Sequence, residues 1–447
     1  MIEYSKMKYS LSLAVILLIM TVIPFFIHSY SPLLCYLFGG IIAFVVLRKW
    51  MFGTVGFIAI ASCIPAGWAA SNITFASVSA LSVAFIRLVQ YLLPCLFFVL
   101  VISEKRKFLK NQLCRLFGGI LCCGFVAFVL TQDKLELFQV LIFWGSSYSM
   151  YYICNRDVKA KLCDILLLID VIFIVSGIYA ILESIFSWGP YMFITLGLSG
   201  NIGEYVGRAK GLLGHPLYLS AFVVVYQSVL FIRYIIYKKF NPFLEIFCLF
   251  IALLTVSRTT IIILVIEYVF FLIATKILRN KKVLFFNIII LLFIIFLVDK
   301  FAVEYVNDLV ERFRYDSVDH RTGAFNTTYN LFLDNPLGVG YHHIMENIRI
   351  GNYGVLSFDS YFTTLDNFFL TGVCAYGVFS LLYLYVFIWP LLNAYKLRKL
   401  QNEMFISTVL LYLTYFMLSF SFNWEANVFL MFLLFGLCGY LQRNLQT

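Results

Sequence analysis

The stretch LCDILLLIDVIFIVSGIYAILESIF, residues 162–186, decides the fold class of this chain. A helix rises about 1.5 Å per residue, so a helix over this stretch is longer than the roughly 30 Å of hydrocarbon in a bilayer. About 14 apolar stretches of this kind divide the sequence, and most are long enough to cross a membrane. The sequence therefore predicts an all-α polytopic membrane protein with about 14 transmembrane helices.

The predicted spans alternate with mostly short connections. They cover residues 11–28, 32–47, 52–70, 82–102, 113–131, 137–154, 162–186, 216–237, 242–256, 259–277, 283–299, 363–392, 404–421 and 424–442. The span 137–154 is the weakest, because Gly145, Ser146 and Ser147 interrupt it and several tyrosines, which favour the headgroup level, crowd it. An interfacial helix is the alternative for this segment.

Lysine and arginine orient the chain in the membrane. Connections rich in these residues alternate with connections that hold almost none, and Lys6, Lys8 and Arg443 mark the two ends. The positive-inside rule places the basic connections and both termini in the cytoplasm. A hydrophobic content of 62% and a mean hydropathy of +0.93 exclude a soluble protein. The net charge of +10 is therefore an orientation signal, and we expect no binding of nucleic acid.

Two long loops fall on the predicted outer face, residues 187–215 and 300–364. The second loop contains two helical patterns, followed by Asn335-Pro336 as a helix stop and Gly338-Val-Gly340 as a turn. The apolar positions of these patterns are Val303, Val306, Val310 and Phe313, then Ala324, Phe325, Thr328, Tyr329 and Phe332. We expect residues 1–447 to form one integral membrane domain, with both loops forming a cap over an active-site cavity.

Several common site chemistries find no support in the sequence. The eleven cysteines fall in predicted spans or on the cytoplasmic side, which favours packing roles over a disulfide framework. There is no Gly-Lys-Ser/Thr phosphate loop, no His-Glu-x-x-His and no dinucleotide fingerprint. The Asp-rich outer motif that a metal-dependent sugar transferase would need is also missing. We therefore expect neither a metal nor a cofactor.

Basic residues on the outer face are the best candidates for ligand binding. Arg208 and Lys210 precede the span that begins at Pro216, and Arg258 lies where two short spans meet. Guanidinium groups bind phosphate through a planar fork and keep their charge at any pH. We predict that Arg208 and Arg258 converge on one diphosphate, with Arg321 as a third contact. The alternative is that each arginine caps a helix end or reaches towards lipid headgroups.

A carboxylate in the same cavity can act as general base on a sugar hydroxyl. Asp366, at the outer start of the span 363–392, is the candidate base, although a helix N-terminus attracts a carboxylate without any catalytic role. His215, His320 and Asn367 complete the predicted substrate-binding residues.

A flippase or another transporter is the non-enzymatic alternative, and it would carry charged residues deep in several spans. Of the acids on the span 162–186, Asp164 and Glu183 lie near its ends and only Asp170 lies deep. This distribution disfavours a transporter.

The second half of the chain resembles the bacterial O-antigen polymerase and ligase superfamily of polytopic glycosyltransferases. The resemblance rests on the order of short motifs between Arg208 and Pro390, which is less than half of the chain. They are Arg208-x-x-Gly211 with His215-Pro216, then Ser257-Arg258, then Arg321 followed by Phe332-Leu-Asp-Asn-Pro336-Leu-Gly-Val-Gly340, and finally Asp366-Asn367 with Gly372 and Gly377. The first 200 residues agree with the superfamily only in hydropathy.

The resemblance implies a GT-C-like, metal-independent glycosyltransferase of the bacterial inner membrane, with an undecaprenyl-diphosphate-linked oligosaccharide as donor. Arg208 and Arg258 would hold the diphosphate, and Arg258 would act catalytically by stabilising it as it departs. Ligases of the superfamily tend to have His-Asn where this chain has Asp366-Asn367. This favours a Wzy-type O-antigen polymerase over a ligase that transfers glycan to lipid A-core. Membrane lipids and a chain-length regulator membrane protein are further candidate partners.

Overall fold

The structure is a computed structural model of the 447-residue chain. It describes residues 112–156, 162–186, 209, 211–213, 216–255, 257–275, 317–351, 365, 367–399, 401–421 and 428–443. The predicted spans 11–28, 32–47, 52–70, 82–102 and 283–299 lie outside these residues, and so does the helix predicted around Val303–Phe313.

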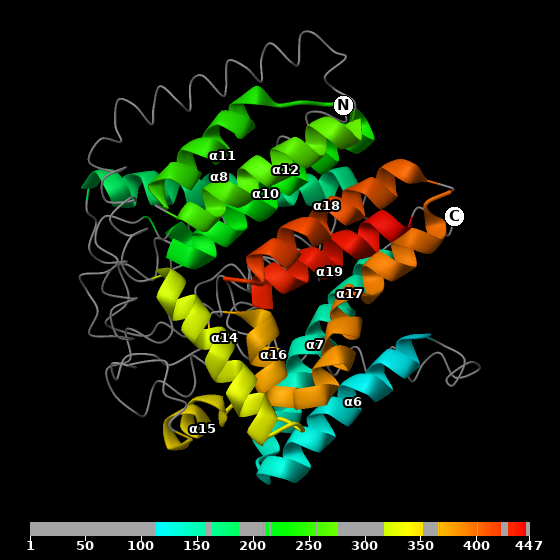
Figure 1. Cartoon of the computed structure of the whole chain (residues 1–447). Helices are drawn as coiled ribbons and strands as arrows, with labels where there is room; N and C mark the ends of the chain where they lie inside the picture. Colours follow the sequence, from blue (N-terminus) through cyan, green and yellow to red (C-terminus); the bar gives the residue numbers. More distant parts are fainter. Residues whose placement is uncertain are drawn as a thin grey trace, which may run out of the picture.

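Every regular element in the described residues is helical (Figure 1). The α-helices are α6 (Gln112–Thr131), α7 (Lys134–Arg156), α8 (Leu162–Phe186), α10 (Pro216–Tyr237), α11 (Pro242–Leu254), α12 (Arg258–Thr275), α14 (Ser317–Asp334), α15 (Ile344–Ile350), α16 (Phe368–Tyr376), α17 (Ser380–Leu397), α18 (Asn402–Leu418) and α19 (Val428–Arg443). Two short 3₁₀ helices are η3 (Gly211–Leu213) and η5 (Gly377–Phe379). The predicted all-α class is confirmed for this part of the chain.

Three helical segments in the described residues are long and apolar enough to cross a membrane, namely Ile165–Leu182, Pro216–Tyr237 and Phe368–Lys396. Shorter apolar helices, such as Thr259–Thr275 and Asn402–Leu418, accompany them. The chain is thus a helical membrane protein, and the number of about 14 crossings stays a prediction.

The weakest predicted span is a continuous helix, α7. The hydroxyl of Ser147 donates to the carbonyl of Phe143, and the hydroxyl of Ser149 donates to the carbonyl of Gly145, both at 2.8 Å. Because these hydroxyls bond to carbonyls of their own helix, the serines are compatible with an apolar bundle. Trp144 in the same helix is fully buried and packs edge-on against Tyr383 at 5.0 Å between ring centroids.

The helices pack in two groups that α18 joins (Figure 1). In one group α10 is central and contacts α8, α11 and α12. In the other, α7 lies against α6 and α19, and α17 lies against α6. Because α18 contacts α10 and α12 as well as α17 and α19, it forms the main described link between the groups.

The predicted span 363–392 corresponds to the helical segment Phe368–Lys396, which is interrupted inside by a short 3₁₀ turn, η5, between α16 and α17. Gly377 marks the break with a φ of +52°, a conformation that side chains beyond glycine rarely adopt. The amide of Val378 donates to the carbonyl of Pro336 at 2.9 Å, so a neighbouring loop fills the break. Hydropathy could not reveal this interruption, since all three pieces are apolar.

That neighbouring loop follows α14, which ends at Asp334 as the predicted stop at Asn335-Pro336 requires. The predicted turn is also present, with φ values of +90° at Gly338 and +80° at Gly340. The amides of Val339 and Gly340 donate to the carbonyls of Cys374 and Ala375 at 2.9 and 3.0 Å. The loop therefore docks backbone to backbone on the end of α16.

The apolar face predicted for α14 is partly wrong. Ala324 and Thr328 are buried as expected, but Phe325 is 51% exposed and Tyr329 is 63% exposed. The buried face continues through Thr327 and Leu331 instead. The thiol of Cys374 on α16 contacts the hydroxyl of Thr328 at 3.5 Å, so small side chains let the two helices approach closely.

Candidate functional site

A hydrogen bond joins Ala209 to the end of α11. The amide of Ala209 donates to the carbonyl of Leu254 at 3.0 Å. Leu254 is the last residue of α11, and Arg258 is the first residue of α12. The backbone of Ala209 therefore lies against the hairpin that α11 and α12 form.

A glycine holds this segment in place. Gly211 begins η3 with a φ of +57°, and η3 packs against α8 and α10. A Cβ on Gly211 would lie 2.9 Å from the hydroxyl oxygen of Ser176 and 3.2 Å from its carbonyl oxygen. Only glycine satisfies both the backbone angle and the close approach, so Gly211 lets the start of η3 lie directly against α8.

The start of α12 offers a second feature suited to an anion. Ser257 is buried, and its hydroxyl oxygen accepts a hydrogen bond from the amide of Thr260 at 3.4 Å, as an N-cap residue does. The amides and dipole at a helix N-terminus favour negative charge. Both Ser257 and Thr260 are buried, so the start of α12 lies inside the helix bundle.

Asn367, a predicted substrate-binding residue, caps helix α16. Its side-chain oxygen accepts hydrogen bonds from the amides of Phe369 and Leu370, both at 3.0 Å. Its amide nitrogen donates to the carbonyl of Phe420 at 3.2 Å, beyond the end of α18. This capping role accounts for an asparagine at this position, and a contact with substrate stays a prediction.

The other predicted site residues are placed only through their neighbours. Asp366 lies outside the described residues, between buried Leu365 and Asn367. Arg208, Lys210 and His215 lie outside them as well, with His215 directly before α10. His320, Arg321 and Arg258 lie on the described backbone of α14 and α12, and their side chains are outside the description. The predicted convergence of the arginine side chains therefore stays a prediction.

A cluster that the sequence did not predict lies between the α6–α7 connection and the loop before α15. Both oxygens of Glu136 accept hydrogen bonds at 2.7 Å, one from the amide of Tyr341 and one from the amide of His342. Asp133 caps α7 through the amide of Leu135 at 2.8 Å and lies 3.4 Å from the imidazole of His343. Glu136 resembles an ordinary first-turn acid in the sequence, so only the fold reveals its partners.

These three residues are also the described group that could hold a metal ion. One ligand atom from each of Asp133, Glu136 and His343 lies within 4.8 Å of the others. However, the carboxylates already accept the amide hydrogen bonds of two helix starts, and His343 packs against Asp133 and Glu346. The arrangement therefore forms a joint between the loop before α15 and the bundle, in which the Nε2 atom of His343 is buried without a hydrogen-bond partner.

Buried acids are more numerous than the sequence suggested. Glu245 on α11 and Glu267 on α12 are 1% and 0% exposed, and Asp170 on α8 is 7% exposed. Asp170 is buried, as predicted for the span 162–186. Burial of Glu245 and Glu267 was not predicted from the sequence, and Glu245, in the first turn of α11, is buried where α11 packs against α10. One argument against a transporter is weakened.

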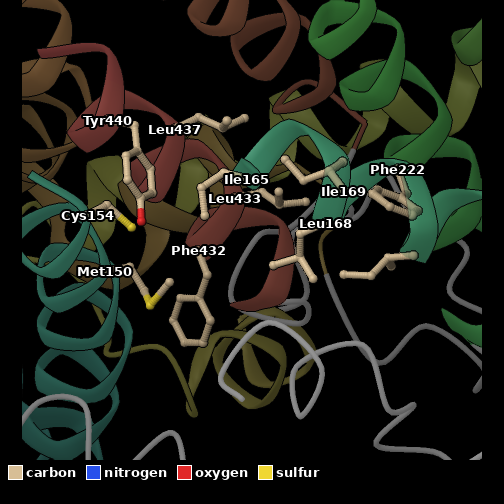
Figure 2. A pocket seen from close by; sticks show the side chains of 12 residues that line it. Met150, Cys154, Ile165, Leu168, Ile169, Phe222, Phe432, Leu433, Leu437 and Tyr440 are labelled. Atoms are coloured by element: carbon tan, nitrogen blue, oxygen red, sulfur yellow. The ribbon is translucent and has the colours of Figure 1, made fainter. Parts of the chain in front are cut away.

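A pocket lies between the two helix groups (Figure 2). Its lining residues come from α7, α8, α10 and α19: Met150, Cys154, Ile165, Leu168, Ile169, Ile172, Phe222, Phe432, Leu433, Gly436, Leu437 and Tyr440. Figure 2 shows Met150 and Cys154 on one side, with Ile169 and Phe222 across from them. This lining carries no charged group, so we do not place proton transfer or diphosphate binding in this pocket.

Comparison with known proteins gives one result. Residues 243–385 match the family model described as O-antigen ligase. The matched region is similar to that family and spans α11 to the first part of α17. It includes Arg258, His320, Arg321, Asp366 and Asn367. It covers less than half of the chain and begins after Arg208, Lys210 and His215. No curated protein and no solved structure matches the chain.

Proposed function

We propose that this protein is a membrane glycosyltransferase that polymerises polysaccharide repeat units on the outer side of the bacterial inner membrane. It would transfer a glycan from an undecaprenyl-diphosphate donor to a lipid-linked repeat unit. The family match supports an enzyme that modifies polysaccharide. The observation that supports the proposal best is the hydrogen bond from the amide of Ala209, the residue between Arg208 and Lys210 in sequence, to the carbonyl of Leu254 at the end of α11, shortly before Arg258.

The proposed reaction is a substitution at the anomeric carbon of the donor glycan. A hydroxyl oxygen of the acceptor sugar forms the new glycosidic bond, and the bond from that carbon to the diphosphate oxygen breaks. Negative charge grows on the departing diphosphate, so cationic groups and helix amides held in place beforehand lower the barrier. Arg208, Lys210 and Arg258, with the N-terminus of α12, would supply them. His320 and Arg321 on α14 would make further contacts with the substrate.

Asp366 is the proposed general base and would take the proton of the acceptor hydroxyl. It lies between Leu365 and Asn367, whose described contacts fix this part of the chain. The hydroxyl of Thr371 donates to the carbonyl of Leu365 at 3.3 Å, and the amide of Phe368 donates to the carbonyl of Ser419 at 2.9 Å. These hydrogen bonds hold the described backbone on both sides of Asp366 in sequence, which supports its choice as the general base.

An O-antigen ligase is the second candidate function, because the matching family model carries that description. In that case the acceptor would be lipid A-core instead of a lipid-linked repeat unit. The Asp366-Asn367 pair, where ligases of the superfamily tend to have His-Asn, favours the polymerase. A chain-length regulator membrane protein is a proposed partner of the polymerase alone.

The test is the length of the polysaccharide in cells that express Arg258→Ala at the wild-type level. A polymerase that depends on Arg258 would give glycan ladders that collapse to a single repeat attached to core. Arg349→Ala is the matched control, since Arg349 is an exposed arginine at the end of α15 within the same family region, and it should keep the full ladder. Polymer that accumulates on its lipid carrier without attachment would indicate the ligase. An unchanged Arg258→Ala ladder would refute the diphosphate-binding role.

A further inference from the structure

The central helix α10 directs three consecutive side chains to three buried carboxyl groups on three other helices. The hydroxyl of Tyr226 donates to Asp170 on α8 at 2.8 Å. The amide nitrogen of Gln227 donates to Glu245 on α11, and the hydroxyl of Ser228 donates to Glu267 on α12 at 3.1 Å. Successive helical residues are rotated by about 100°, so each side chain faces a different neighbouring helix. α10 is thus the polar centre of an otherwise apolar group of helices.

The three carboxyl groups differ in how their charge is balanced. Asp170 pairs with the guanidinium of Arg233 at 2.6 Å. Among the described residues, no lysine or arginine contacts Glu245 or Glu267, although both are essentially without solvent exposure. A bare carboxylate inside a membrane protein is strongly disfavoured, because nothing replaces its lost water. Each of these two glutamates therefore requires a proton or another small cation.

The contacts of Glu267 favour a proton. The hydroxyl oxygens of Ser228 and Thr414 lie 2.7 Å apart, and both are hydrogen-bonded to the same oxygen of Glu267. The hydroxyl of Thr414 is also 3.0 Å from the carbonyl of Leu410. Each of these four contacts needs one hydrogen, and the hydroxyls of Ser228 and Thr414 supply only two in total. If Glu267 carries a proton, its O–H donates to the hydroxyl oxygen of Thr414, and the Thr414 hydroxyl then donates to the carbonyl of Leu410. The hydroxyl hydrogen of Ser228 is shared between the Thr414 hydroxyl oxygen and the Glu267 oxygen.

Neighbouring atoms show the same shortage of hydrogen. The second oxygens of Glu245 and Glu267 and the side-chain oxygen of Gln227 are buried and have no hydrogen-bond partner. Buried acceptors are nearly always satisfied in folded proteins, so three unsatisfied ones around α10 indicate that this network has fewer donor hydrogens than its acceptors can use. Two of the three, on Glu245 and Gln227, lie outside the contacts of Glu267 counted above.

We propose that Glu267, together with Ser228 and Thr414, forms a proton-binding site inside the helix bundle, with Glu245 and Gln227 as an adjacent acceptor pair. The site does not depend on the glycosyl transfer proposed above. Loss of the proton would leave an unbalanced charge between α10, α12 and α18. Since Ser419, at the end of α18, holds the start of α16, proton binding has a direct structural link to the backbone next to Asp366.

The test uses the purified full-length protein in detergent and the lipid-soluble reagent dicyclohexylcarbodiimide, which reacts with protonated carboxyl groups in apolar surroundings. Mass spectrometry should find an adduct on Glu267 that declines as the pH rises and is absent from E267Q. Glu403 is the internal control, because its side chain is 53% exposed and pairs with Lys238, so it should stay unlabelled. The amide of E267Q mimics a neutral acid, and this variant should keep the wild-type Tm to within a few degrees.

Two outcomes would overturn the proposal. The first is an unlabelled Glu267 over the whole pH range. The second is protection of Glu267 from the reagent by NaCl but not by choline chloride, which would assign the site to Na⁺ instead of a proton. Because labelling is measured on wild-type protein and not on glycan, a failure of the proposed polymerase activity leaves this test unaffected. A poorly folded variant leaves the wild-type labelling result intact.

Discussion

The carbonyl oxygen of Pro336 lies 2.1 Å from the position that a Cβ on Gly377 would occupy. The approach is mutual, since a Cβ on Gly338 would lie 2.4 Å from the carbonyl oxygen of Ala375. Two turns with positive φ thus fit together backbone to backbone, where any side chain would force them apart. The glycines that carried part of the family resemblance form a structural joint between the outer loop and the bundle.

The first prediction concerns this joint. Gly377→Ala should destabilise the protein by more than about 2 kcal/mol, because it adds a positive-φ penalty to a direct clash with the backbone of Pro336. Two measurements check this. One is thermal unfolding of the detergent-purified protein, and the other is the fraction of that protein that elutes as a monodisperse peak in size-exclusion chromatography.

Gly118→Ala is the matched control for that change. Gly118 lies within α6, and a Cβ there would meet nothing within 4 Å. Replacing it should leave the Tm unchanged or raise it slightly, since alanine favours a helix by roughly 0.5–1 kcal/mol over glycine. Equal behaviour of the two variants would show that the joint is not held by backbone contact.

The second prediction separates the two roles of Asn367. Asn367→Ala removes the cap of α16 and should cost about 1 kcal/mol of stability. Asn367→Asp keeps a capping oxygen and should retain most of the Tm, although it loses the hydrogen bond to the carbonyl of Phe420. If Asn367 also contacts substrate, Asn367→Asp will shorten the polysaccharide while the Tm is retained. A wild-type ladder from a stable Asn367→Asp protein would leave the residue a cap alone.

Much of the helical framework could be predicted from hydropathy and caps. The observed bounds of α8 and α10 equal the predicted spans 162–186 and 216–237, because basic residues, Pro216 or long polar loops flank an uninterrupted apolar run. The break at Gly377 could not be found in this way. It depends on backbone angles and on a loop that is distant in sequence, neither of which changes the local hydropathy.

For the candidate site too, some residues could be predicted from the sequence and others could not. The sequence predicts Arg208 and Arg258 on the outer face, and their convergence stays a prediction, since the structure describes neither side chain. Glu245 and Glu267 were overlooked, because a single acid within or beside an apolar run carries no sign of its depth or partners. Nor did the sequence indicate that Arg233, near the end of α10, pairs with Asp170 inside the bundle. Pairing between helices is a property of the fold.

The third prediction tests this buried pair. Arg233→Met should cost about 3–5 kcal/mol, because Asp170 would remain as an uncompensated charge in an apolar bundle. The double variant Arg233→Met with Asp170→Leu removes both charges and should recover most of the loss. The measurement is a double-mutant cycle of unfolding midpoints in detergent. Simple additivity of the two single changes would mean that the pair contributes no coupling energy.

The fourth prediction concerns the joint at Glu136. Glu136→Gln should cost roughly 1–3 kcal/mol, because the new side-chain amide group cannot accept a hydrogen bond from one of the two backbone amides, at Tyr341 or His342. The loop backbone approaches this side chain closely, since a Cβ on Gly340 would lie 2.8 Å from the Glu136 carboxylate. Limited proteolysis should then cut the chain near α15 faster than in wild-type protein.

Glu346→Gln is the control for Glu136→Gln, since the Glu346 side chain is 65% exposed and should tolerate the change with wild-type proteolysis. Chelation separates the joint from a metal site. If Glu136, Asp133 and His343 serve only as a joint, extensive dialysis against EDTA will leave both the Tm and the cutting rate of wild-type protein unchanged. A fall in Tm after dialysis that zinc or manganese reverses, and that is absent from Glu136→Gln, would instead make these residues metal ligands. That result would also contradict the expected metal independence of the enzyme.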